Sequence, residues 1–485
     1  MTNIRQMPAS LPRPQYVPVP EAFISALAWK ILDVDALENE TGSHSDVPMV
    51  REPNGKPIGL LYRTGGGSSR VITIKQTLPS GERLSEFKKA LSSSGLHIHG
   101  SEALLAEAIL NSLDGVRVEK SSSQPASPLT PSIALLQNMR GVSGVKGPPD
   151  VAAIVESLYA RGAGSQPESL SASRLWLKAA NRRMDVDPLL RALDTAVDRS
   201  LLGSRRKDTA QIDAEQASGA LGSGDYTGTP FDWFAAVWNR LTSDAWVQAL
   251  PARVWVDWAT TVLRLATGMS FLWECAWNEE FARGVLREGT VTWSSIRDGV
   301  PAVLPWRSSR AGKVALDVAP QLISKVHRSE RIRVLLGDWQ KDHDALDSTF
   351  ESTLFDMRAD AAFRLQLTDA LGSERQTNSG KNLWEAIKYA LKTRETSAAQ
   401  ADYYGLLRTN GRYLSVEPGT EWIAVVASLA CENPGGFTDV GRLMSDLRSL
   451  GMRPDLPDLI GLLERAGLAR GSADADQGVV IESAF

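Results

Sequence analysis

Residues 259–277, ATTVLRLATGMSFLWECAW, form the most apolar stretch of the chain and decide its fold class. Apolar side chains recur here at spacings of three and four, which places them on one stripe of a helix; the stripe consists of Trp255, Trp258, Val262, Leu265, Met269, Leu272 and Ala276. Arg264 and Glu274 charge the stretch, whereas a bilayer span requires about 20 nearly uncharged residues. The stretch therefore predicts a core helix.

Tryptophan is concentrated around this helix, because nine of the 14 tryptophans lie between Trp233 and Trp306. They can form a stacking platform for bases or an aromatic interface. Tryptophans at helical spacing usually face inward, however, so core filling is the favoured interpretation. Two further apolar stripes follow, formed by Leu346, Phe350, Leu354 and Leu365, and by Leu383, Trp384, Ile387 and Leu391. Residues 231–405 are therefore expected to form a Trp-rich helical domain.

The first 120 residues indicate a small α+β domain. Five prolines in residues 1–20 predict an extended arm. Two short runs rich in aliphatic and β-branched residues, 57–63 and 70–76, flank the loop TGGGSS at residues 64–69, which is typical of a β-hairpin. Helical patterns occupy residues 21–36, 81–94 and 101–113.

Residues 121–230 are expected to contain linkers with intervening helices. The clearest linker is SSSQPASPLTP at residues 121–131, since Ser and Pro do not pack a core. Further loose segments lie at residues 162–168 and 207–229. The fold class that follows is mainly α and multidomain, with a small α+β N-terminal domain and a distinct module at residues 406–485.

That C-terminal module is the most interpretable part of the chain. Thr438 can cap its second helix, and Gly467 is placed to end the third helix in a left-handed conformation. Three helices are predicted at residues 421–430, 439–450 and 455–466, with turns at 433–436 and 451–454. Two short strands, at 468–470 and 478–481, enclose a polar loop.

The order of these elements, with LLERAGLAR at residues 462–470 and VVIE at 479–482, resembles the winged helix-turn-helix family. The resemblance implies that the third helix enters the DNA major groove. Residues 436–485 contain five Arg and no Lys against eight Asp or Glu, a charge balance that repels phosphate. Packing against another protein, or against the helical domain, is therefore favoured, and the candidates for a basic edge are Arg442, Arg448 and Arg453.

Composition restricts the environment and the partners of the protein. The net charge of -4 does not suggest a surface that coats nucleic acid. Cys275 and Cys431 are far apart and form no CxxC pair, which fits a reducing compartment. The N-terminus lacks the apolar core of a signal peptide. A cytoplasmic protein without a membrane contact is expected.

No motif predicts a catalytic centre, a metal site or a cofactor. His97 and His99 share one side of a possible strand, but no third ligand accompanies them. Asp342 and Asp344, with Asp347 and Glu351, have the spacing of an acidic metal site, although a charged helix start is the favoured interpretation. The loop at 64–69 lacks the Gly-Lys-Ser/Thr of a phosphate-binding loop.

One basic cluster remains as a candidate phosphate-binding surface. Its alternative interpretation is a solvated face whose charge is balanced by neighbouring acids. The cluster consists of Arg307, Arg310, Lys313, Lys325, Arg328, Arg331 and Arg333.

Three functional hypotheses follow. The favoured one is a non-enzymatic accessory subunit, because the combination of an α+β domain, a Trp-rich body and a terminal winged helix loosely resembles accessory proteins of bacterial anti-phage defence and DNA-restriction systems. That resemblance implies protein partners such as an ATPase, methyltransferase or nuclease, with DNA as a possible further ligand. The alternatives are an enzyme, such as a metal-dependent nuclease, whose site forms no motif, and a DNA-binding transcription regulator.

Overall fold

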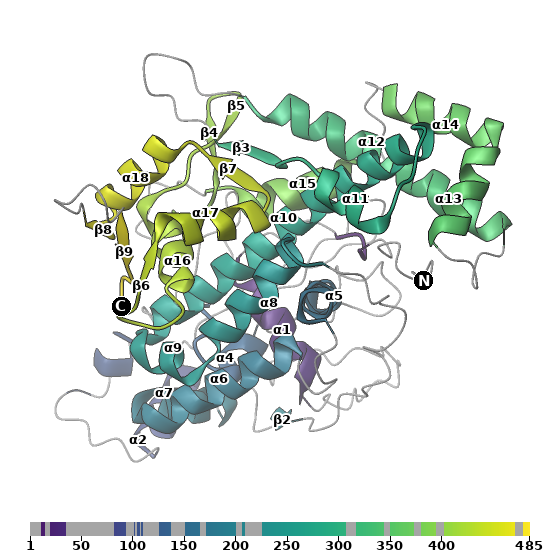
Figure 1. Ribbon diagram of the computed structural model, residues 1–485. Helices are drawn as coiled ribbons and strands as arrows, with labels where there is room; N and C mark the ends of the chain where they lie inside the picture. The colour runs from purple at the N-terminus through teal and green to yellow at the C-terminus, as the bar shows by residue number, and fades with distance from the viewer. Residues whose placement is uncertain are drawn as a thin grey trace, which may run out of the picture.

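The computed structural model shows a mainly helical protein with a few short strands (Figure 1). The mainly α body predicted from the sequence is confirmed. The structure describes residues 11–14, 20–34, 82–93, 101, 104–106, 108–109, 126–136, 151–164, 171–199, 206–208, 226–306, 317–343, 350–372, 380–393, 402–470 and 479–485.

Helix α10 (Ala252–Leu286) is the centre of the fold. Residues 258–282 are buried without interruption, so the helix is enclosed on all sides and the predicted single stripe was too narrow. The elements packed against it include α5 (Val151–Ala163), α8 (Pro230–Leu241), α11 (Trp293–Gly299), α12 (Ala319–Asp342) and α15 (Lys381–Leu391). No helix in the described part of the chain has both the length and the hydropathy required to cross a membrane.

The tryptophans fill the core, as the helical spacing predicted. All 14 are buried, including Trp29 and Trp176 outside the Trp-rich region. Several pack on one another or on phenylalanine, as where the ring centroids of Trp277 and Phe281 stack at 5.1 Å. A tryptophan stacking platform for bases is therefore not present on the surface.

Helices α13 (Phe350–Ala359) and α14 (Ala361–Gly372) divide a segment predicted as one stripe. The side chain of Asp360 accepts a hydrogen bond from the backbone N–H of Phe363 at 2.9 Å and so caps the start of a second helix. The apolar face of this second helix does not continue that of the first. Phe350 and Leu354 are buried as predicted, but Leu365 is 72% exposed. Leu346 lies outside the described residues.

The helices that precede α8 begin at recognisable caps. Thr130 caps α4 (Pro131–Leu135), Ser171 caps α6 (Ala172–Val186), and Asp187 caps α7 (Pro188–Val197). Proline occupies the first position of α4 and α7, where no backbone donor is needed. Helix α9 (Asp244–Ala249) follows α8. Residues 121–230 thus contain more packed helix than the linker composition suggests.

The N-terminal region supplies α1 (Ala22–Ile31), which packs on α4, α5, α6 and α10. The predicted helix at 21–36 ends at Ile31, because β1 (Leu32–Val34) pairs antiparallel with β2 (Arg206–Asp208). Helix α2 (Glu82–Ser92) matches the pattern at 81–94. The hairpin predicted at 57–76 lies outside the described residues, as does most of the helix at 101–113.

Buried side chains from Leu11 to Ile481 form one connected core. The predicted domain boundaries at 120, 230 and 405 stay predictions, because burial alone does not test them. A hairpin of β4 (Leu407–Asn410) and β5 (Tyr413–Val416), not anticipated from the sequence, opens the C-terminal region.

The C-terminal region continues with the expected helices and strands. Helices α16 (Thr420–Ala430), α17 (Val440–Ser449) and α18 (Leu456–Arg465) lie close to the predicted limits. Strands β6 (Phe437–Asp439), β9 (Val480–Glu482) and β8 (Ala469–Arg470) form an antiparallel sheet in that order. Gly467 has φ of 73°, as predicted for the end of α18.

Two local expectations in this region were wrong. Thr438 lies in β6, and α17 is capped instead by Asp439, whose carboxylate accepts the N–H of Arg442 at 2.8 Å. The predicted turn at 451–454 contains β7 (Met452–Pro454), which pairs parallel with β3 (Leu304–Trp306). Both differences arise from strand pairing between distant segments, which a local pattern does not reveal.

Candidate functional site

The C-terminal region is docked firmly on the helical body. Strand β7 pairs with β3, and α16 and α17 both pack on α8. The indole N–H of Trp246 donates to the carbonyl oxygen of Glu432 at 2.8 Å, and Arg240 donates to the carbonyl of Leu429 at 2.9 Å. The rings of Trp306 and Trp422 meet edge to face at 6.0 Å. One side of the region is therefore occupied by the body of the same chain.

Helix α18 lies on the other side, at the outer edge of the molecule (Figure 1). It packs inward on α16 through Leu459, Leu462 and Leu463, all of them buried. Its outer side carries a shallow, open groove whose lining includes the buried Gly461 together with Leu456, Pro457, Ile460, Glu464 and Arg465. A helix face of this composition suits a protein surface better than a phosphate backbone.

The outer face of the small sheet is partly apolar as well. Phe437 and Val480 share that face, because the register opposes Phe437 to Glu482 and Asp439 to Val480. The side chain of Phe437 is 62% exposed. Ile481 on the opposite face is buried. The sheet thus adds acidic and apolar groups to the outer surface of the module.

The three arginines predicted to form a basic edge differ in their surroundings. Arg442 on α17 lies 3.5 Å from Asp446 and 3.8 Å from Glu432, so its charge is shared with two carboxylates. Arg448 is exposed on the same helix. It follows Arg442 by six residues, so the two side chains point in directions roughly 120° apart around the helix axis. Arg453 is exposed on β7. Within the described chain, neither Arg448 nor Arg453 forms an ion pair.

The basic cluster around α12 is largely neutralised by carboxylates. Arg328 pairs with Glu279 of α10 at 2.8 Å, Arg331 with Asp369 of α14 at 2.7 Å, and Arg333 with Glu330 at 3.3 Å. Lys325 is buried, and burial lowers its pKa against the opposing effect of Glu279. Arg307, Arg310 and Lys313 lie outside the described residues. The four described cations therefore offer α12 little unshared positive charge.

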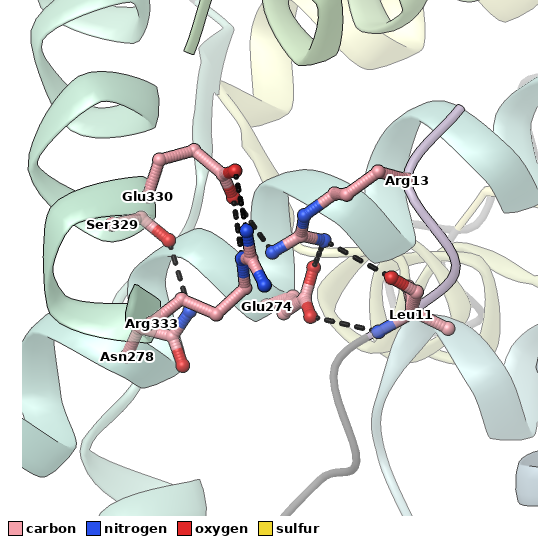
Figure 2. Close-up of polar contacts among 7 residues, drawn as sticks. All are labelled: Leu11, Arg13, Glu274, Asn278, Ser329, Glu330 and Arg333. Atoms are coloured by element: carbon pink, nitrogen blue, oxygen red, sulfur yellow. Dashed lines mark hydrogen bonds and ion pairs between the residues drawn. The ribbon is translucent and has the colours of Figure 1, made fainter. Parts of the chain in front are cut away.

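These pairs belong to a wider ionic network between α10 and α12. Arg283 lies 3.2 Å from Glu279 and 3.3 Å from Glu280, and Arg287 lies 2.8 Å from Glu280. Asn278 donates a hydrogen bond to the hydroxyl of Ser329 at 3.0 Å (Figure 2). Glu279 and Glu280, in the last third of α10, supply the carboxylates for Arg283, Arg287 and Arg328.

A short N-terminal segment completes the network, and sequence reasoning missed it. Arg13 lies 2.6 Å from Glu274 on α10 and 2.7 Å from Glu330 on α12 (Figure 2). Burial alone lowers the pKa of Arg13, but Glu274 and Glu330 raise it above its ordinary value. The available signal was weak: an arginine between prolines in the predicted arm, and an isolated Glu274 in an apolar helix.

The groups considered for metal or nucleophilic chemistry are placed as follows. Asp342 ends α12 instead of starting a helix, and His343 stacks on Trp339 with ring centroids 4.1 Å apart. Asp344 and Asp347 lie outside the described residues, as do His97, His99 and the loop at 64–69. Burial raises the pKa of the Cys275 thiol to about 12, which keeps the sulfur protonated and unreactive. Among described residues, no three His, Cys, Asp or Glu side chains are grouped as metal ligands would be.

Comparisons with known proteins identified no relative of this chain. No protein-family model, no curated protein and no solved structure matches the chain.

Proposed function

We propose that residues 406–485 contain a winged helix-turn-helix module, formed by the elements from α16 onward. The order α16, β6, α17, β7, α18, β8 and β9 supports this assignment, as does the sheet order β6-β9-β8, while β7 pairs with β3 of the body. Helix α18 corresponds to the helix that enters the major groove in DNA-binding members of that family.

We further propose that this module binds protein and that the chain is a non-enzymatic accessory subunit of a bacterial DNA-handling assembly. The observation that carries the proposal is the position and chemistry of α18. The module uses α16, α17 and β7 to contact its own body, which leaves Leu456 and Pro457 of α18 exposed and Ile460 half-buried beside them.

The assembly is of the kind that anti-phage defence and restriction systems build, with an ATPase, methyltransferase or nuclease supplying the chemistry. The ionic network and the buried tryptophans support a rigid scaffold role for the helical body. A rigid body that presents one apolar surface suits a subunit whose task is to position other proteins.

The test is a tagged pull-down from the native host, with co-purified proteins identified and nucleic acid assayed in the eluate. Leu456→Asp combined with Ile460→Asp places charge in the groove, and Leu365→Asp is the matched control on the exposed face of α14. We expect a DNA-acting partner to be recovered with the unaltered chain and with the control but lost from the groove variant. A clean monomer, or equal recovery with all three proteins, contradicts the proposal.

DNA binding is the second candidate function, and the exposure of Arg448 and Arg453 without ion-pair partners in the described chain favours it. Phosphate contacts make affinity depend on salt. If DNA is the ligand, replacing both arginines with alanine weakens retardation of a DNA fragment and lowers the salt slope by roughly 2. Unchanged retardation would remove these two residues as phosphate contacts.

A further inference from the structure

Residues 11–14 are held on the helical body by polar contacts to the backbone of Leu11 and to the side chain of Arg13. Glu274 accepts the backbone N–H of Leu11 through Oε1 at 2.9 Å and the guanidinium Nη1 of Arg13 through Oε2 at 2.6 Å. The Nη2 atom of the same guanidinium lies 2.7 Å from Oε1 of Glu330. A planar group with two forked nitrogens thus bridges carboxylates from two helices (Figure 2).

Both carboxylates are buried. A buried carboxylate needs a nearby cation to remain charged, because it has lost its contact with water. The side chains of Glu274 and Glu330 are 2% and 4% exposed. Leu11 and Pro14 are buried on either side of the arginine, whereas Pro12 is exposed. The site therefore takes one apolar residue, one guanidinium and one proline from an extended segment.

The segment itself is preorganised for this site. Proline fixes its own φ and restricts the residue before it to extended conformations. In Leu11-Pro12-Arg13-Pro14 each non-proline residue precedes a proline, so all four residues favour the extended form. Such a segment loses little conformational entropy when it binds.

The site formed by the carboxylates of Glu274 and Glu330 is called the socket. When residues 11–14 leave the socket, positively charged side chains remain near both carboxylates. Glu330 keeps its contacts with Arg333, whose Nε lies 3.3 Å from Oε1. Glu274 remains within the electrostatic influence of Arg161, a buried cation on α5. Each carboxylate therefore still has a cation nearby after Arg13 is released.

From these contacts we infer that the socket formed by Glu274 and Glu330 is a recognition site for the arginine of an extended, proline-flanked peptide. In the structure the chain's own residues 11–14 occupy it as an exchangeable strap. This inference is independent of the proposed function of the C-terminal module.

The test uses the full chain with Arg13→Ala, which removes the guanidinium from the socket but leaves both carboxylates. The probe is the synthetic peptide SLPRPQY, residues 10–16 with blocked ends, and binding is measured by calorimetry. We expect the variant to bind this peptide at least tenfold more tightly than it binds SLPAPQY. The unaltered chain, whose socket is filled, should bind SLPRPQY at least tenfold more weakly than the variant does.

Adding Glu274→Gln to Arg13→Ala is the matched control and should abolish the preference for the arginine peptide. Absence of peptide binding to a variant with the circular dichroism spectrum of the unaltered chain would overturn the inference. If Arg13→Ala folds poorly, ethylguanidinium replaces the peptide as probe. It should then raise the melting temperature of Arg13→Ala but not that of the double variant, and an equal effect on both would overturn the inference.

Discussion

Arg264 on α10 and Asp402, which precedes the β4–β5 hairpin, form an ion pair of 2.8 Å in which the side chains are 4% and 3% exposed. Arg264 also donates through Nε to the carbonyl of Ala390 at 2.9 Å and through Nη2 to that of Lys392 at 2.8 Å. One guanidinium therefore joins the central helix to the end of α15 and to the start of the C-terminal region.

Removal of this arginine should destabilise the protein strongly. Arg264→Ala leaves Asp402 buried without its cation, which typically costs about 3–5 kcal/mol. Arg191→Ala is the control, because its pair with Asp185 has side chains 59% and 71% exposed and such pairs contribute at most about 1 kcal/mol. Urea unfolding measures both, and a loss below about 1 kcal/mol for Arg264→Ala would contradict this view of the pair.

Close contact between α5 and α8 requires glycine at position 162. A Cβ atom on Gly162 would lie 1.9 Å from the backbone oxygen of Phe231, whereas one on Gly337 in α12 would meet nothing within 4 Å. Gly162→Ala should cost about 1–3 kcal/mol or more through overpacking. Gly337→Ala should instead stabilise by roughly 0.5–1 kcal/mol, since alanine is the better helix former. Thermal unfolding of the two variants distinguishes them by sign, and two shifts in the same direction would refute the packing argument.

Acid should weaken the fold through His327. The ring is 7% exposed, its Nδ1 has no hydrogen-bond partner among the described residues, and burial lowers its pKa against the opposing effect of Glu330. Below the unfolded pKa of about 6.5 the unfolded chain binds a proton that the folded chain resists, so the free energy of unfolding falls as pH falls.

Urea unfolding between pH 7.5 and 5 tests the role of this histidine. The decrease should be smaller in His327→Gln, and subtraction of the two curves removes the contribution of other groups such as Asp257, whose pKa burial raises. Identical pH profiles for the two proteins would exclude His327 as the cause.

The indole hydrogen bond that secures the C-terminal region should be measurable by itself. Trp246→Phe removes the donor to the carbonyl of Glu432, in a hydrogen bond that is partly buried. Trp176→Phe is the control, because the Trp176 indole N–H is buried without a hydrogen-bond partner in the described structure. Trp246→Phe should cost about 0.5–1.5 kcal/mol more than Trp176→Phe in urea unfolding, the net contribution of an ordinary hydrogen bond. Equal losses would show that packing volume alone accounts for both.

Sequence periodicity was sufficient for the central helix, for two helices of the C-terminal region and for the burial of the tryptophans. The helix at 252–286 and the two helices between 440 and 465 follow apolar spacings that any isolated segment displays, because a helix positions residues three and four apart on one face. Gly467 could be placed for the same reason, since its left-handed conformation is a local requirement of a helix end. The acidic character of the C-terminal module likewise follows from composition alone, because a charge count does not depend on how the chain folds.

Only the tertiary structure shows which distant segments these helices and strands contact. The contact of Arg13 with Glu274 spans 261 positions, and the pairing of β7 with β3 joins segments about 150 residues apart, so no local pattern encodes either. The basic cluster of α12 shows the same limit, because its neutralising partners Glu279 and Asp369 come from two other helices. Local spacing determines which residues can share a face, whereas the partner of each charge depends on chain packing across the whole core.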